Sequence, residues 1–159
     1  MILRPALLAA ACLLPAAALA DACAPVAAAY AKLGEVPAYR QVIAIAGQED
    51  AETIAVGDTL YIRSGDGRET LPLPPGGRKQ IMSQIVGNGQ LTDCAPAGAE
   101  SIDGVATTAH GYQPPKMGNF PMSRQTVWIG DADGLPRRMA TDDGSTSVEI
   151  SYEGVVAPM

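Results

Sequence analysis

The sequence predicts an α+β domain in which a long antiparallel β-sheet carries two or three short helices on one face. The clearest observation is the stretch 123–156, where three strand-forming runs are joined by polar turns at 131–134 and 142–144. Each turn begins with Asp and ends with Gly, the residues that short hairpin turns favour. The last run alternates without a break, and its apolar face carries Val148, Ile150 and Tyr152. One dry and one wet face are typical of an antiparallel sheet.

The first half of the chain contains a helical pattern followed by an up-and-down group of strands. Residues 24–33 are predicted to be helical, because Pro25 suits the first turn of a helix and the apolar residues share one face. That face carries Val26, Ala29, Tyr30 and Leu33. Strands are then expected at 39–46, 52–56 and 59–63, since short polar turns separate these runs.

The middle of the chain is expected to change from strand to helix. Residues 71–77 contain three prolines, so this stretch cannot be a central strand. Residues 78–86 are then predicted to form a helix whose apolar stripe packs on the sheet. The stripe consists of Ile81, Met82, Ile85 and Val86. An extended segment is expected at 91–94.

A strand at 105–112 leads into a proline-rich loop at 113–122 that is unusually apolar. Its large apolar side chains are Met117, Phe120 and Met122. Exposed, they would form an adhesive patch or a flap over a cavity; folded inward, they would plug the core. The plug, or a mixture of plug and flap, is favoured because an isolated exposed patch promotes aggregation.

Residues 1–20 have the pattern of a cleaved signal peptide. Arg4 precedes an apolar run at 6–14, and Ala18-Leu-Ala20 fits the small-x-small rule for cleavage before Asp21. The run is too short to span a bilayer, and a lipoprotein anchor is less favoured because Cys12 lies inside it. The sequence therefore predicts export to the periplasm and a single domain over 21–159.

The charge balance argues against nucleic acid as a partner. The whole chain has a formal net charge of −6, and loss of Arg4 with the leader makes the mature chain one unit more negative. Such a surface repels a phosphate backbone. No apolar run after the leader is long enough for a transmembrane anchor.

The two cysteines that follow the leader, Cys23 and Cys94, are predicted to form a disulfide. An even pair in an oxidising compartment is usually bridged. A metal pair or a reactive thiol is the alternative, but no further metal-ligating residues flank either cysteine. Closing a loop of about 70 residues stabilises the fold by roughly 4 kcal/mol on the chain-entropy model.

No grouping of side chains in the sequence points to catalysis, a metal or a cofactor. His110 is the only histidine, and no Gly-x-Ser-x-Gly motif is present. The turn at 131–134 resembles half of a calcium loop but lacks the remaining acidic ligands. Glu149 and Glu153 share a strand face at about 13 Å along the strand, beyond the spacing of paired glycosidase carboxylates. We therefore expect a protein that is not an enzyme.

Small residues within the predicted strands leave volume on the sheet to be filled. They are Ala44, Ala46, Ala55, Ala106 and Ala109. The space between sheet and helices is then either a packed core, filled by methionines, or an apolar cavity.

The order of these parts resembles the LolA-like superfamily of periplasmic lipoprotein-carrier domains. Residues 56–62 (Val-Gly-Asp-Thr-Leu-Tyr-Ile) are similar to a hairpin of that family, and 127–137 (Val-Trp-Ile-Gly-Asp-Ala-Asp-Gly-Leu-Pro-Arg) to its late strand, turn and strand. The resemblance implies a curved, incompletely closed barrel with helices over its mouth, able to accept acyl chains. The family's Arg-Pro-x-x-Phe segment is missing between Tyr39 and Leu71, which marks a divergent member.

Two functional hypotheses follow from these patterns. The first is a non-catalytic periplasmic protein that binds a lipid or a lipoprotein acyl chain, in envelope lipid or lipoprotein handling. Its predicted apolar wall consists of Val42, Ile54, Leu60, Ile62, Ile81, Met82, Ile85, Met117, Phe120, Trp128 and Ile150. The alternative is a packed interaction module without a cavity, whose loop at 113–122 docks an envelope protein.

Overall fold

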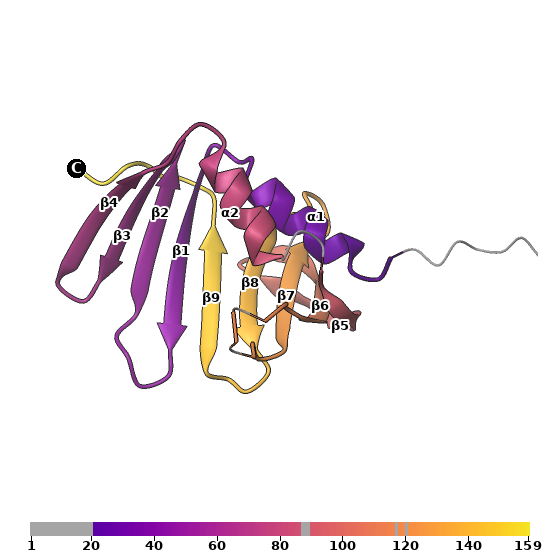
Figure 1. Cartoon of the computed structure of the whole chain (residues 1–159). Helices are drawn as coiled ribbons and strands as arrows, with labels where there is room; N and C mark the ends of the chain where they lie inside the picture. The colour runs from indigo at the N-terminus through magenta and orange to yellow at the C-terminus, as the bar shows by residue number, and fades with distance from the viewer. Residues whose placement is uncertain (1–20, 87–89, 117, 120) are drawn as a thin grey trace, which may run out of the picture.

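A computed structural model describes residues 21–86, 90–116, 118–119 and 121–159. Within them the chain forms one nine-stranded antiparallel sheet and two α-helices that lie on the same side of it (Figure 1). The helices are α1 (Ala24–Leu33) and α2 (Gly77–Ile85). The strands are β1 (Ala38–Ile45), β2 (Ala51–Val56), β3 (Thr59–Ser64), β4 (Gly67–Pro72), β5 (Thr92–Ile102), β6 (Val105–Gln113), β7 (Gln125–Gly130), β8 (Pro136–Thr141) and β9 (Thr146–Ser151).

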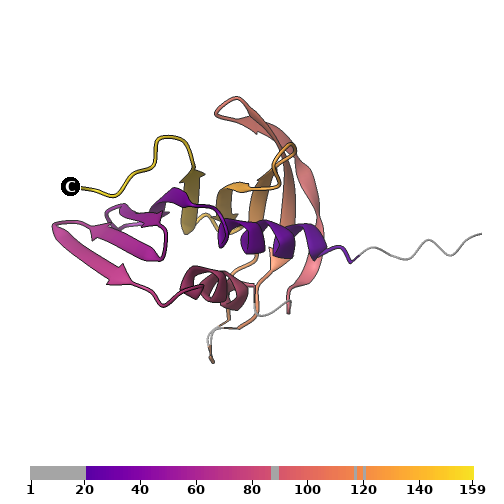
Figure 2. The same cartoon turned by 90° about the horizontal axis from the view of Figure 1, so that it is seen from above.

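The sheet consists of two meanders joined by a pairing between distant parts of the chain. Its strand order is β4-β3-β2-β1-β9-β8-β7-β6-β5. The seam is the antiparallel pair β1 and β9, where Arg40 lies opposite Ser151 and Ile45 lies opposite Thr146. Strands β4 and β5 are the two edges, so the sheet is not closed into a barrel. Seen from above, it bends around the two helices, which lie in its hollow (Figure 2).

Helix α1 has the bounds and the buried face that its apolar spacing predicts. Its buried residues are Val26, Ala29, Tyr30 and Leu33. Proline occupies the first turn, where a missing backbone N–H is tolerated, and Gly34 is the C-cap residue. Together with Met82 of α2, Ala55 of β2 and inward-facing residues of β1, β6, β7 and β9, these side chains form the main core.

Helix α2 connects the two edges of the sheet across its concave face (Figure 1). Gly76 before it has a φ of 76°, and a Cβ added at Gly77 would lie 2.8 Å from the Leu73 Cβ, so the chain enters the helix through a tight corner. Met82 is buried, but Ile85 is 45% exposed. The prediction that the whole stripe packs is therefore wrong at Ile85, which lies in the last turn.

The predicted α+β class with an open curved sheet is confirmed, and the helices described number two. Two strands had no prediction: β4, and β5 beyond the short extended segment at 91–94. Both are edge strands. Strand β4 is exposed throughout and has no apolar alternation. Strand β5 contains Pro96 next to a break in pairing register, a combination that an edge tolerates because one row of its backbone groups needs no partner.

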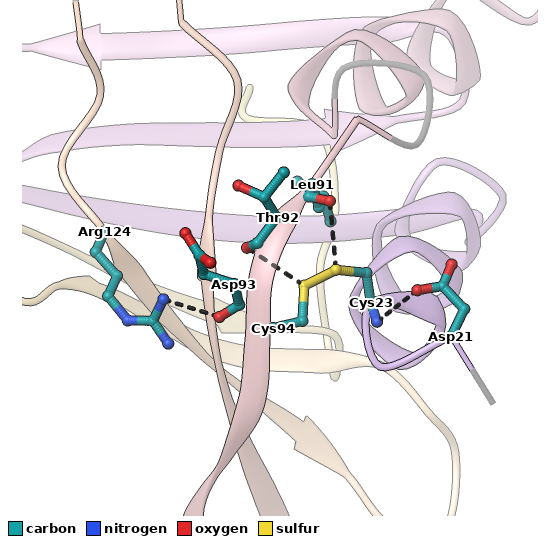
Figure 3. The surroundings of a disulfide bond; sticks show 7 residues. All are labelled: Asp21, Cys23, Leu91, Thr92, Asp93, Cys94 and Arg124. Atoms are coloured by element: carbon teal, nitrogen blue, oxygen red, sulfur yellow. Dashed lines mark hydrogen bonds between the residues drawn. A yellow bond between two sulfur atoms is a disulfide. The ribbon is translucent and has the colours of Figure 1, made fainter. Parts of the chain in front are cut away.

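A disulfide between Cys23 and Cys94 fixes the start of α1 to edge strand β5 (Figure 3). On either side of it, the Asp21 carboxylate accepts a hydrogen bond from the Cys23 backbone N–H at 3.0 Å, and Arg124 donates to the Asp93 carbonyl at 2.8 Å. The bridge thus links the helix layer to the far edge of the sheet. The predicted leader, 1–20, lies outside the described residues, and within the described part neither helix has the length and apolarity to cross a membrane.

Candidate ligand cavity

A cavity of about 310 Å³ lies between the concave sheet face, the end of α2 and the segment after β6. Strands β1, β7, β8 and β9 contribute the sheet side. Its lining residues are Tyr30, Gln41, Ile43, Gln84, Ile85, Pro114, Pro115, Lys116, Met122, Gln125, Met139, Val148 and Ile150. The lining is mostly apolar, with a few amide and hydroxyl groups and one ammonium group, which is the usual composition of a small-molecule site.

Burial separates the lining into a floor and a rim. The floor residues are more than nine-tenths buried: Tyr30, Gln125, Val148 and Ile150. The rim residues are exposed: Gln84, Ile85 and Lys116. An elongated molecule that entered this cavity would therefore place one end against the buried side chains of the floor and leave the other end near water at the rim.

A buried chain of hydrogen bonds runs along the floor. The Tyr112 hydroxyl donates to the Gln125 Oε1 at 2.6 Å, so the Tyr30 hydroxyl, 2.9 Å away, must donate to the Tyr112 oxygen. The two rings meet edge to face with centroids 6.4 Å apart. Burial raises the pKa of both Tyr30 and Tyr112, so both hydroxyls stay protonated at neutral pH.

The loop after β6 turns Pro114, Pro115 and Met122 toward the cavity, whereas Pro121 is exposed. The Gln113 side-chain amide donates to the Met122 carbonyl at 2.7 Å and ties the two ends of the loop together. Pro114 is buried, and Met122 lines the cavity. These positions agree with a loop that partly fills the space beneath it. Met117 and Phe120 lie outside the described residues.

The structure brings only part of the predicted wall to this cavity. Ile85 and Ile150 line it. Met82 belongs to the packed core, and Leu60 and Ile81 pack against that core. Most residues that line the cavity were not in the predicted wall. Val148 could have been included, because the alternation of its strand places it on the same face as Ile150.

Val42, Ile54 and Trp128 lie on the opposite, convex face of the sheet. Val42 pairs with the exposed Glu149, whose strand neighbours Val148 and Ile150 point to the helices. Trp128 pairs with Arg138, which lies 5.4 Å from its ring centroid. Adjacent residues of a strand alternate between faces, so these three side chains cannot share a wall with Ile150.

Ile54 and Ile62 line a different and more polar hollow of about 390 Å³ at β2–β4. Its other side chains include Glu52, Arg63 and Arg68. This composition is unsuited to a bare hydrocarbon chain, because charged groups lose hydration when apolar matter covers them.

His110 lies beside α1, apart from the cavity described above. It lines a hollow with Lys32 and Asp131, and burial lowers its pKa. The Asp131 carboxylate accepts a hydrogen bond from the Thr108 hydroxyl at 2.7 Å. Within the described residues no group of three or more His, Cys, Asp or Glu side chains is placed to hold a metal ion.

No family model matches this sequence, and no curated protein matches it either. Several solved structures match the fold of this chain. Lipoprotein LppX of Mycobacterium tuberculosis is 18% identical, with 87% of this chain and 96% of LppX covered at a TM-score of 0.52. MucB in the MucA/MucB complex of Pseudomonas aeruginosa is 13% identical, with 87% of this chain covered at a TM-score of 0.51.

This chain spans 59% of the matched chain in that complex. A LolA superfamily protein of Nitrosomonas europaea matches at 8% identity, with 72% of this chain and 82% of the other covered and a TM-score of 0.26. The match to LppX, at a TM-score of 0.52 and 18% identity, confirms the LolA-like resemblance for the fold alone.

Proposed function

We propose that this chain is a non-catalytic binding protein for an apolar ligand, a lipid or an acyl chain, held in the cavity between the concave sheet face and α2. The observation that carries the proposal is the cavity itself, a hollow of about 310 Å³ with a dry floor and an open rim. The pattern of residues 1–20 supports a periplasmic location, where such a protein would take part in envelope lipid or lipoprotein handling.

Apolar burial supplies the binding energy in this proposal. Removing apolar surface from water contributes about 25 cal/mol per Å², or roughly 0.8 kcal/mol for each methylene group. At about 310 Å³ the cavity is near the lower end of the ~300–1,000 Å³ range of small-molecule sites. Its volume therefore favours a single chain over a multi-chain lipid.

The position of the loop after β6 favours a ligand over the alternative of a docking module. A docking loop would present its apolar residues to solvent, whereas Pro114 and Met122 face the cavity. The MucA/MucB complex shows that a chain of this fold can have a protein partner. In the present chain, no described apolar residue of the loop is left on an outer surface for one, apart from the exposed Pro121.

Two tryptophan variants on neighbouring residues of β1 test the proposal. Ile43 lines the cavity, so Ile43→Trp should fill it and reduce the binding of a fluorescent fatty acid by at least tenfold. Val42 lies on the convex face, so Val42→Trp should leave binding within about twofold. Equal binding by the two variants, or no binding by the wild-type protein after delipidation, would contradict the proposal.

A further inference from the structure

The charge of the cavity lining differs from the charge of the chain. The whole chain has a net charge of −6, with 17 acidic and 11 basic residues. Among the residues that the structure describes, no carboxylate lines the cavity, and Lys116 is the one charged residue of its lining. The formal charge of the described lining is therefore positive, whereas the net charge of the protein is negative.

Lys116 also lacks a counter-ion, unlike most cations that the structure describes. Six basic residues form ion pairs there: Arg40, Arg63, Lys79, Arg124, Arg137 and Arg138. Lys116 has no ion pair within the described part of the chain. The acidic residues that reach the base of the same loop are already engaged, Asp142 by Arg124 and Asp143 by the Ser123 hydroxyl.

The separation of floor and rim fixes the orientation of an amphiphilic ligand. Val148 and Ile150 offer apolar surface on the buried side, while Lys116 and the Gln84 amide stand on the exposed side. An apolar tail gains free energy on the floor, and a charged head keeps its hydration only at the rim. An ammonium group there attracts an anionic head and repels a cationic one.

We propose that the ligand is a single-chain amphiphile with an anionic headgroup, whose tail lies on the cavity floor and whose head lies at Lys116. This inference rests on the proposed function and narrows it to a chemical class. A carboxylate and a phosphate monoester share the required charge, and neutral lipids of the same chain length lack it.

The test compares palmitate with methyl palmitate, which has the same tail and no charge, on the delipidated mature protein. At low salt the wild-type protein should bind palmitate about fivefold more tightly than methyl palmitate. The difference is modest because a partly exposed ion pair contributes little free energy. The preference should shrink as salt is added. Lys116→Met should abolish the preference and leave methyl palmitate binding within about twofold. Lys79→Met, on α2 and paired with Glu35, is the matched control and should keep the preference.

Three outcomes of this comparison overturn the inference. If both probes bind the wild-type protein equally, or if Lys116→Met weakens both to the same degree, the anionic preference is wrong while the proposed function stands. If neither probe binds, both fail. Palmitoyl lysophosphatidate, measured in parallel, separates the two anionic classes: tighter binding than palmitate that depends on Lys116 identifies a phosphate head.

Discussion

The two halves of the sheet share one hydrogen-bonded ladder but bury very different amounts of surface. In the half covered by the helices, β6, β7 and β9 contribute core residues that are at most 8% exposed: Tyr112, Val127, Ile129, Val148 and Ile150. In the wing formed by β2–β4, Ala55 is the one buried residue, and all of β4 is exposed. Leu71 on β4 is 39% exposed.

This difference follows from where the helices lie and not from the strands themselves. Apart from Ala55 and Leu60, which meet the core, the wing depends on its backbone ladder and on ion pairs such as that of Glu52 with Arg40 and Arg63. Exposed pairs of this kind contribute little. The cavity lies on the covered side of this division, because β1, β7, β8 and β9 line it and none of its described lining residues comes from β2–β4. Regular hydrogen-bonded strand pairing therefore does not by itself show which part of the sheet is most stable or where a ligand binds.

The largest expected effect is loss of the disulfide that anchors the covered half. Cys94→Ser frees a loop with a sequence separation of 71 residues. The free energy of unfolding should fall by about 4 kcal/mol, as measured by chemical denaturation under oxidising conditions. Reduction of the wild-type protein should cause a similar loss and should leave the variant unchanged. A loss below about 1 kcal/mol would show that the bridge does not hold α1 to β5.

A matched pair of leucines compares the two halves directly. Leu33 on α1 is fully buried, so Leu33→Ala should cost about 2–5 kcal/mol of unfolding free energy through lost burial and a new cavity. Leu71→Ala on β4 should cost less than about 1 kcal/mol, because much of the side chain is already in water. Similar losses in urea denaturation would break the distinction between covered half and wing.

The buried hydroxyl chain gives the next effect. Tyr112→Phe removes the donor to Gln125 and the acceptor of Tyr30, and so leaves two buried polar groups without partners. The expected cost is about 1–3 kcal/mol. Tyr61→Phe on β3 is the control from the wing and should be nearly neutral. The same denaturation assay on both variants decides whether this chain of hydrogen bonds stabilises the covered half of the sheet.

The buried tyrosines predict a loss of stability in alkali. Burial raises the pKa of Tyr30, Tyr39, Tyr112 and Tyr152 above the ordinary value near 10. Above about pH 10 the unfolded chain loses these protons while the folded chain keeps them. These tyrosines should add no pH dependence below that pH, and stability should fall above it by up to ~1.4 kcal/mol per pH unit for each of them. A level profile to pH 11 would contradict the burial of these side chains.

The smallest expected effect belongs to the ion pairs of the wing. Glu52→Gln removes the carboxylate that Arg40 and Arg63 share. The two arginine side chains are 45% and 57% exposed, and the Glu52 side chain is 17% exposed. The unfolding free energy should change by less than about 1 kcal/mol, with the difference shrinking as salt is raised. A loss comparable with that of Leu33→Ala would mean that charges hold the wing together.

Local patterns in the sequence predicted the local structure well. The spacing of Val26, Ala29, Tyr30 and Leu33 gave the buried face of α1, and the alternation of Val148 and Ile150 gave the inner face of β9. Each pattern arises because one helix or strand turns one face toward the buried side of the sheet. It can therefore be recognised in the sequence before the fold is known.

The long-range arrangement could not be predicted in the same way. The seam between β1 and β9 joins ends of the chain, and no local pattern encodes it. Strand β4 has no apolar alternation, since an exposed edge needs none. Val42 and Trp128 look like core residues in sequence but lie on the convex face, where Arg138 covers the indole. Only part of the predicted wall therefore meets the cavity.

Native mass spectrometry of the mature protein, purified gently from its own compartment, tests the central claim most directly. We expect adducts of single-chain lipid mass that vanish on denaturation. Ile43→Trp should lose them, and Val42→Trp should retain them. A bare wild-type chain that also takes up no added palmitate would contradict the claim that this cavity holds a lipid.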